Sequence, residues 1–233
     1  MHFTGGDIVL VLFSMTSFFD IQNIFFTTLG YPMSYLEFVG VITGGVAVWL
    51  SARGNVWSWP LGIINVTLIF FLVYQVQLYP DMFLQVFFFV TNIFGWWRWT
   101  HPGAGEEDKK NELRVSWMPV RTLVIFSALT ILGTLLFGIF ARNLHGLFPK
   151  VFSLPSAFPY WDSFVAVISI VATYLMVQKK VECWLAWILA DVIATYLYFA
   201  KGIMFLSVEY FAFCVIAAFG FWKWQNDYKS YKT

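Results

Sequence analysis

The stretch "CWLAWILADVIATYLYF" at residues 183–199 combines an aromatic surface with an ionisable group. Trp184, Trp187 and Asp191 follow at spacings of three and four, so a helix would place them on one face. An ionisable side chain within a membrane helix is costly and normally faces the protein interior. A helix that only faces lipid needs neither feature near its middle. This face is therefore the first candidate for binding a small molecule.

A second group of polar side chains lies in other apolar stretches. Gln85 and Asn92 are seven residues apart, which again places them on one helix face. Asn65 lies in the preceding apolar stretch, and Glu209 and Tyr210 lie in the last one. The first half of the chain thus supplies amides, and the second supplies aromatic and acidic groups. This difference suits an asymmetric ligand with an aromatic part and a hydrogen-bonding part.

The same residues also have structural explanations. Tryptophans near helix ends usually form the interfacial belt, which applies to Trp59 and less to Trp187, one turn deeper than Trp184. An amide such as Asn92 can instead join two helices, contributing about 0.6–2 kcal/mol. The acidic groups of the last two stretches can form a network with neighbouring tyrosines. The belt is also the expectation for Trp97, Trp99, Trp222 and Trp224.

The composition indicates an all-α integral membrane protein. Hydrophobic residues make up 60% of the chain and charged residues 12%, with a mean hydropathy of +0.72, whereas soluble domains carry about 25% charge. Runs of roughly 20 apolar residues recur along the chain. We predict an interfacial or partly inserted N-terminal helix, followed by seven transmembrane helices. The seven helices are expected at residues 34–52, 57–77, 80–99, 118–140, 160–178, 182–200 and 204–224.

The basic residues orient these helices. Of the 14 Lys and Arg residues, only Arg142, Lys150 and Lys201 fall on the side opposite the C-terminus. Because Lys and Arg concentrate on the cytoplasmic side, we predict a cytoplasmic C-terminus and an external N-terminus.

An internal repeat organises the chain. "GWWRW" at 95–99 resembles "GFWKW" at 220–224, and an offset of 125 aligns residues 35–99 with 160–224 without gaps. The offset pairs Trp59 with Trp184 and Gln85 with Tyr210, so Trp59 and Tyr210 join the candidate site. Each repeat holds three helices, and one helix between them restores the orientation, giving 3+1+3 parallel repeats. Transporters bind substrate near mid-membrane where repeats meet.

The predicted segments are a 1–33 N-terminal segment, a 34–99 first repeat, a 100–159 cytoplasmic loop with linker helix and external loop, a 160–224 second repeat and a 225–233 cytoplasmic tail.

Other functional classes find little support in the sequence. The three histidines lie in loops, and no nucleophile and base share a stretch. Neither a metal-binding spacing nor a nucleotide-binding motif occurs. We therefore expect no enzyme activity, metal, cofactor or nucleic-acid partner. A proton-coupled carrier using Asp191 or Glu209, a channel and a membrane scaffold remain as alternatives to a simple transporter.

Five motifs lie along the apolar stretches. They are "LGIINVTL" (61–68), "QLYPDMFLQVFFFVTNIFGWWRW" (77–99), "FPYWDS" (158–163), "VECWLAWILAD" (181–191) and "SVEY" (207–210). Together they resemble the PnuC-type nicotinamide riboside transporters. The resemblance covers about residues 34–225 and implies a 3+1+3 fold like that of the SWEET sugar carriers, in a bacterial inner membrane. It also implies a homotrimer and facilitated diffusion (uniport) of a vitamin or nucleoside, trapped by a cytoplasmic nicotinamide riboside kinase that feeds NAD biosynthesis.

The resemblance also assigns roles to the candidate residues. The family's Trp-x-x-Trp motif falls on Trp184 and Trp187, and its amide positions fall on Gln85, Asn92 and Asn65. The tryptophans would hold the cationic nicotinamide ring, an attraction of about 0.5–2 kcal/mol or more, and the amides would bond the carboxamide and ribose.

The charges of the candidate site then bear on selectivity. Asp191 or Glu209 would balance the ring's charge or position a tryptophan. Mid-span Lys and Arg are absent, so we expect the phosphorylated mononucleotide to be rejected. Thiamine, riboflavin or a deoxynucleoside remains an alternative substrate.

Overall fold

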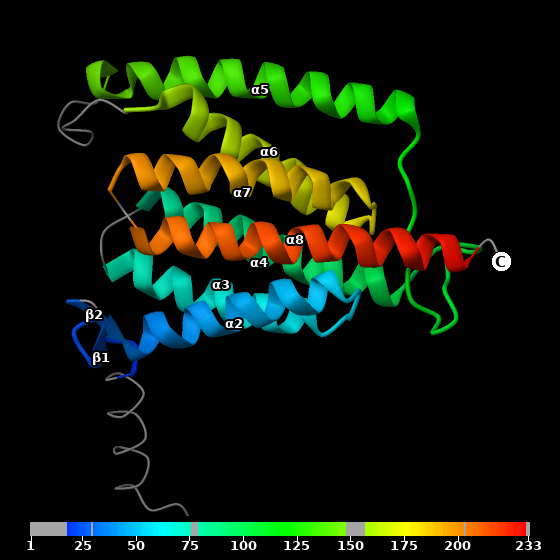
Figure 1. Cartoon of the computed structure of the whole chain (residues 1–233), viewed down its shortest axis with the longest axis horizontal. Helices are drawn as coiled ribbons and strands as arrows, with labels where there is room; N and C mark the ends of the chain where they lie inside the picture. Colours follow the sequence, from blue (N-terminus) through cyan, green and yellow to red (C-terminus); the bar gives the residue numbers. More distant parts are fainter. Residues whose placement is uncertain (1–17, 29, 76–78, 148–156, 203, 232–233) are drawn as a thin grey trace, which may run out of the picture. The chain divides into compact units, whose positions relative to one another are not determined.

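The computed structural model describes residues 18–28, 30–75, 79–147, 157–202 and 204–231 (Figure 1). Its two compact units comprise Met1–Leu50 with Val56–Trp96, and Ser51–Asn55 with Trp97–Thr233. Each unit is described by itself. The described elements are β1 (Ile24–Thr28), β2 (Tyr31–Ser34), α2 (Tyr35–Ala52), α3 (Ser58–Gln75), α4 (Tyr79–Thr100), α5 (Val120–Leu147), α6 (Pro159–Val177), α7 (Glu182–Ala200) and α8 (Met204–Ser230).

All seven stretches expected to be helical are helices, most within two residues of the predicted bounds. α5 and α8 run further than expected, to Leu147 and Ser230, because polar residues after the apolar part continue the same helix. α6 starts with Pro159 in its first turn and Asp162 nearby, which suits the exposed N–H groups of a helix start. In the second unit, α5 packs on α6, α6 on α7, and α7 on α8 (Figure 1).

Five helices of the described residues are long and apolar enough to cross a membrane. They are Tyr35–Ala52, Ser58–Gln75, Val120–Asn143, Pro159–Val177 and Glu182–Ala200. α4 and α8 are not among them, so seven spans remain a prediction.

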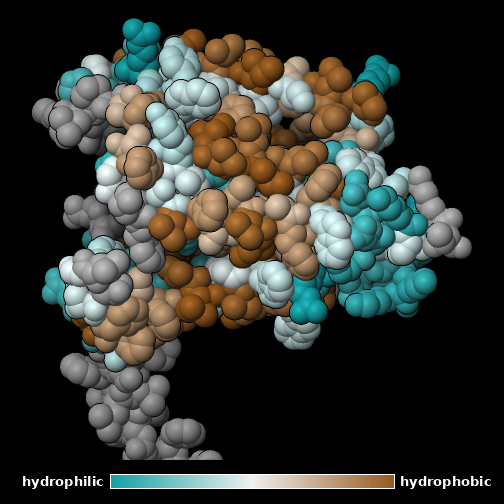
Figure 2. Space-filling model, in the orientation of Figure 1, coloured by the Kyte–Doolittle hydropathy of each residue, from teal (hydrophilic) through white to brown (hydrophobic). Residues whose placement is uncertain are grey.

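Large apolar side chains are exposed along α5, where Val120 is 76% and Val124 62% exposed. Figure 2 shows apolar atoms along α5 and hydrophilic atoms near the C-terminus, as expected of a lipid-facing helix.

The prediction of an N-terminal helix is wrong for residues 24–28 and 31–33. β1 and β2 form an antiparallel hairpin in which Thr28 pairs with Tyr31. Gly30 has φ +82, a conformation that favours glycine and tight turns, and aromatic and Thr side chains favour strands. Residues 19–23, just before the hairpin, are not helical either. The rest of this prediction, within residues 1–17, lies outside the described residues.

The hairpin leads directly into α2. The Glu37 backbone N–H donates to Ser34 Oγ at 3.1 Å, which caps the helix start. Tyr31 donates to the Glu37 carboxylate at 2.6 Å. The pKa of Tyr31 is raised to about 12, mainly because the side chain is partly buried and secondly because of this hydrogen bond to Glu37.

Candidate functional site

In the second unit, Trp184 is packed beneath α8. Its side chain is 1% exposed, and a Cβ at Gly220 would lie 2.6 Å from the Trp184 ring. Its ring also meets Trp224 edge-on, with centroids 5.3 Å apart. Only glycine at position 220 allows this approach. Trp184 is therefore held by protein on at least two sides.

Trp187 and Asp191 carry polar groups that the described residues leave unmet. The Trp187 indole N–H is buried and finds no acceptor among them. Asp191 is 3% exposed, and its carboxylate accepts no hydrogen bond that the described part of the chain supplies. Leaving a buried polar group unpaired costs about 1–3 kcal/mol, so two such groups one turn apart call for an explanation such as a ligand or water.

The neighbouring face of α8 supplies aromatic and polar contacts. Tyr210 stacks on Tyr198 of α7, with centroids 5.2 Å apart and planes at 9°. Ser207 donates to the Thr195 carbonyl at 2.9 Å. Glu209, the remaining candidate on α8, is half-buried. The structure thus brings Tyr210 onto the helix that carries Trp187, within the second unit.

In the first unit, two of the candidate amides join helices. Asn65 donates to the Gly40 carbonyl of α2 at 2.7 Å. Asn92 donates to the Phe88 carbonyl at 2.8 Å, and its amide occupies the space that a Cβ at Gly62 would need. The Asn65 bond crosses from α3 to α2, as the helix-joining explanation expects. The Asn92 bond stays within α4, and Asn92 meets α3 through its packing on Gly62. Gln85 is half-buried and makes no side-chain hydrogen bond to the described residues.

Trp59 in the first unit repeats the arrangement of Trp184. It is 4% exposed, and its ring occupies the space of a Cβ at Gly95. Positions 59 and 95 correspond to 184 and 220 under the offset of 125. Sequence reasoning aligned these tryptophans and glycines but did not predict that each pair would touch. The glycine of "GWWRW" and "GFWKW" was the available signal.

Trp99 and Trp224 were missed by sequence reasoning, which assigned both to the interfacial belt. That prediction is wrong, because both are 0% exposed and their ring centroids lie 5.8 Å apart. Trp99 donates to the carbonyl of Met176 at 3.1 Å, and Trp224 donates to that of Ser51 at 3.2 Å. Trp97 and Trp222, by contrast, are 53% and 58% exposed. Within each motif, therefore, one tryptophan faces outward and another is buried.

The two buried indoles make reciprocal bonds. Position 51 corresponds to 176, and 99 to 224, under the same offset. Each indole thus donates to the last turn of the first helix of the opposite repeat. The two bonds thus follow the offset of 125 that defines the predicted repeat.

Comparisons with known proteins show the family to which the chain belongs. A family model described as nicotinamide mononucleotide transporter matches residues 34–226. The nicotinamide riboside transporter PnuC of Escherichia coli K12 is 33% identical over 229 residues, covering 90% of this chain and 95% of that protein. The chain belongs to this family. It is therefore a multi-pass membrane transporter of the PnuC family rather than an enzyme.

Two further relatives bear on substrate and fold. The riboflavin/roseoflavin transporter RibM of Streptomyces davaonensis is 26% identical over 190 residues, covering 81% of this chain and 83% of that protein. The crystal structure of the vitamin B3 transporter PnuC has a TM-score of 0.62 at 22% identity, covering 98% of this chain and 94% of that one. At that identity the crystal structure shows a shared fold alone.

Proposed function

We propose that this protein carries nicotinamide riboside across a bacterial inner membrane by facilitated diffusion. The observation that carries the proposal is a run of buried polar groups on one face of α7 that the described residues leave unmet: the indole N–H groups of Trp184 and Trp187 and the Asp191 carboxylate. A riboside of nicotinamide offers a carbonyl acceptor, a flat cationic ring and ribose hydroxyls. The indole N–H and ring face suit the carboxamide and the cation, and the carboxylate balances the positive charge.

The other candidate residues would have supporting or additional roles. Trp184 would hold the α7–α8 contact that presents Trp187, and Tyr210 would extend the aromatic surface. Gln85, whose amide has no side-chain bond to the described residues, would bond ribose or carboxamide, with Asn92, Asn65, Trp59 and Glu209 completing the set. This shared site follows from residue types and from the family resemblance.

The remaining features of the proposal are architectural and mechanistic. We propose seven spans with an external N-terminus, 3+1+3 repeats that rock to give alternating access, and a homotrimer. Uniport needs no coupling ion, so inward flux would be sustained by phosphorylation of the riboside by a cytoplasmic kinase.

Binding to purified protein tests the proposed substrate. Nicotinamide riboside should bind saturably, whereas the mononucleotide should not, because a phosphate would meet the Asp191 charge. Trp187→Ala should abolish binding, and Trp222→Ala, at an exposed site, should preserve it. Riboflavin or thiamine binding better than the riboside would contradict the substrate. Counterflow in liposomes that is unchanged by a proton gradient is the expected result for uniport.

A further inference from the structure

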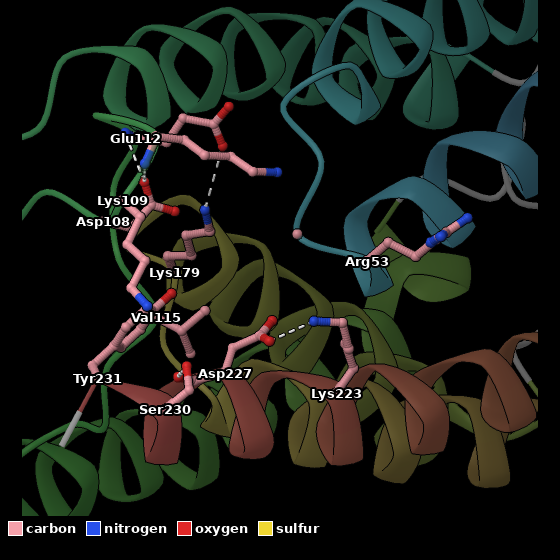
Figure 3. Close-up of a pocket in the computed structure, with 12 residues that line it drawn as sticks. Arg53, Asp108, Lys109, Glu112, Val115, Lys179, Lys223, Asp227, Ser230 and Tyr231 are labelled. Carbon is pink, nitrogen blue, oxygen red and sulfur yellow. Dashed lines mark hydrogen bonds and ion pairs between the residues drawn. The ribbon is translucent and has the colours of Figure 1, made fainter. Parts of the chain in front are cut away.

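A pocket of about 220 Å³ opens at the end of α6 in the second unit (Figure 3). It is several times the ~30 Å³ that one water occupies in the liquid and smaller than the roughly 300–1,000 Å³ clefts that hold drug-sized ligands. Its volume therefore suits a small group rather than a whole cofactor. Five of its lining side chains are Lys or Arg and three are Asp or Glu.

Lys179 is the most unusual residue of this pocket. Its side chain is almost fully buried, with a relative exposure of 3%. Its ammonium makes no hydrogen bond to the described residues, since the nearest carboxylate oxygen, on Glu112, is 3.9 Å away. Burial lowers the pKa of Lys179, against the opposing effect of Glu112. This ion pair and the ring of Trp99, whose centroid lies 4.4 Å from the Lys179 ammonium, partly compensate the buried charge. The N–H donors of the ammonium nevertheless make no hydrogen bond to the described residues and can serve a ligand.

The backbone of Lys179 ends α6 in a left-handed conformation. Its φ is +51, which is uncommon for a side-chain-bearing residue. The N–H groups of Lys179 and Lys180 donate to the carbonyls of Met176 and Leu175, a helix C-cap that glycine usually fills. The repeat-equivalent position holds Gly54, at φ +67. The second repeat thus places a lysine, with its buried ammonium, where the first repeat has glycine.

Neighbouring groups limit what the pocket can accept. Lys223 is paired with Asp227, and Figure 3 shows the two side chains pointing toward each other. Lys109 and Lys110 are exposed and form no ion pair with the described residues. The three acidic groups would repel any anion, but the five cations outnumber them. This surplus favours one compact anion with several acceptor oxygens over a ligand that carries several separate carboxylates. A phosphate group has this chemistry.

We propose that this pocket binds a phosphate group, with the buried Lys179 ammonium as its main contact and Lys109 and Lys110 at its entrance. Two sources share this chemistry, a small soluble phosphate compound and an anionic phospholipid headgroup. The site is separate from the proposed riboside site, where phosphate is expected to be rejected.

Calorimetric titration of the purified full chain with inorganic pyrophosphate tests the proposal. At about 0.15 M salt, one saturable site per chain is expected. Lys179→Met should weaken binding by about tenfold or more, the factor that ~1.4 kcal/mol represents. Lys229→Met removes an exposed lysine outside the lining and should leave binding unchanged.

A second variant protects the test against misfolding. Lys109→Ser with Lys110→Ser alters only exposed loop side chains and should weaken pyrophosphate binding severalfold. Absent binding by the unmodified protein, or equal affinity in both pocket variants, would overturn the proposal. Neither outcome depends on riboside transport, so the two proposals can fail separately.

Lipid nanodiscs distinguish the two phosphate sources. If pyrophosphate binds equally in phosphatidylcholine and phosphatidylglycerol nanodiscs, the pocket takes a soluble phosphate. If phosphatidylglycerol removes pyrophosphate binding only when Lys179 is present, the headgroup is the source. Both results support phosphate recognition by this pocket. If phosphatidylglycerol nanodiscs reduce pyrophosphate binding by the Lys179→Met variant as much as by the unmodified protein, the result counts against it.

Discussion

The two tryptophan–glycine contacts, Trp59 on Gly95 and Trp184 on Gly220, share a geometry but differ in surroundings. Beside the first lies an amide, Asn92, packed on Gly62. Beside the second, the Trp184 ring meets the ring of Trp224, and Trp187 follows one turn later on α7. Under the repeat offset, Gly62 corresponds to Trp187 and Asn92 corresponds to Ala217. The two halves of the predicted repeat thus share a tight helix contact and exchange large and small residues next to it.

This exchange separates packing from ligand recognition. The tryptophan–glycine pairs occur in both repeats, so they serve the common architecture. Trp187 and Asp191 correspond to Gly62 and Val66, which carry no comparable chemistry. Residues present in one repeat alone are therefore the ones to examine for substrate binding.

The largest effect is expected from closing the glycine contacts. Gly95→Ala and Gly220→Ala each force a methyl into an indole ring, and such overpacking costs about 1–3 kcal/mol. Both variants should lower the thermal unfolding midpoint in detergent by similar amounts. Gly45→Ala is the control, because nothing lies within 4 Å of its added Cβ. If Gly220→Ala left the unfolding midpoint unchanged while Gly95→Ala lowered it, the two tryptophan–glycine contacts would not be energetically equivalent.

A somewhat smaller effect is expected at the reciprocal indoles. Trp99→Phe and Trp224→Phe each remove one buried hydrogen bond, worth about 0.5–1.5 kcal/mol, plus a little packing. Their midpoints should fall by similar amounts, whereas Trp97→Phe, at an exposed position, should change little. Strongly unequal losses would show that the two bonds are not energetic equivalents.

A double-mutant cycle can test whether the small residue Gly62 makes room for the larger Asn92. Gly62→Ala should cost about 1 kcal/mol, because the Asn92 amide must shift, and Asn92→Ala in the same chain should recover part of that loss. Additive losses would mean that the two positions do not share the space.

The smallest effect is expected at the basic residue of each motif. Arg98 pairs with Glu106 at 2.7 Å, as its equivalent Lys223 pairs with Asp227. The hydrogen bond from Arg98 lowers the pKa of Glu106 from its ordinary value of 4.5. The pair therefore stabilises the fold fully above the ordinary pKa of the carboxyl, and this contribution is lost as the pH falls through the lowered pKa. Because Glu106 is exposed, Glu106→Gln should cost less than about 1 kcal/mol. Unfolding midpoints of both proteins, compared at neutral and acid pH, should converge in acid.

The helices could be predicted because apolar runs are a local property of the sequence. The internal repeat stays a prediction that the aligned motifs indicate. The hairpin was missed because an apolar segment with polar interruptions also fits an interfacial helix. The burial of Trp99 and Trp224 was missed for another reason. A tryptophan at a helix end looks the same in sequence whether it faces lipid or a distant carbonyl.

The candidate residues show the same limit. Spacing identified the face shared by Trp187 and Asp191, since helical periodicity depends only on sequence. The partners of Asn65 and Asn92 depend on which glycines lie opposite, and periodicity does not contain that information.

The exchanged indole bonds also order events during synthesis. The Ser51 carbonyl accepts a local bond from the Gly54 N–H, but its second bond comes from Trp224, 173 residues further along the chain. The indole of Trp99 likewise donates to an acceptor made 77 residues later. Both indole bonds therefore need residues of the second half of the chain, and neither can form while only the first half has been synthesised.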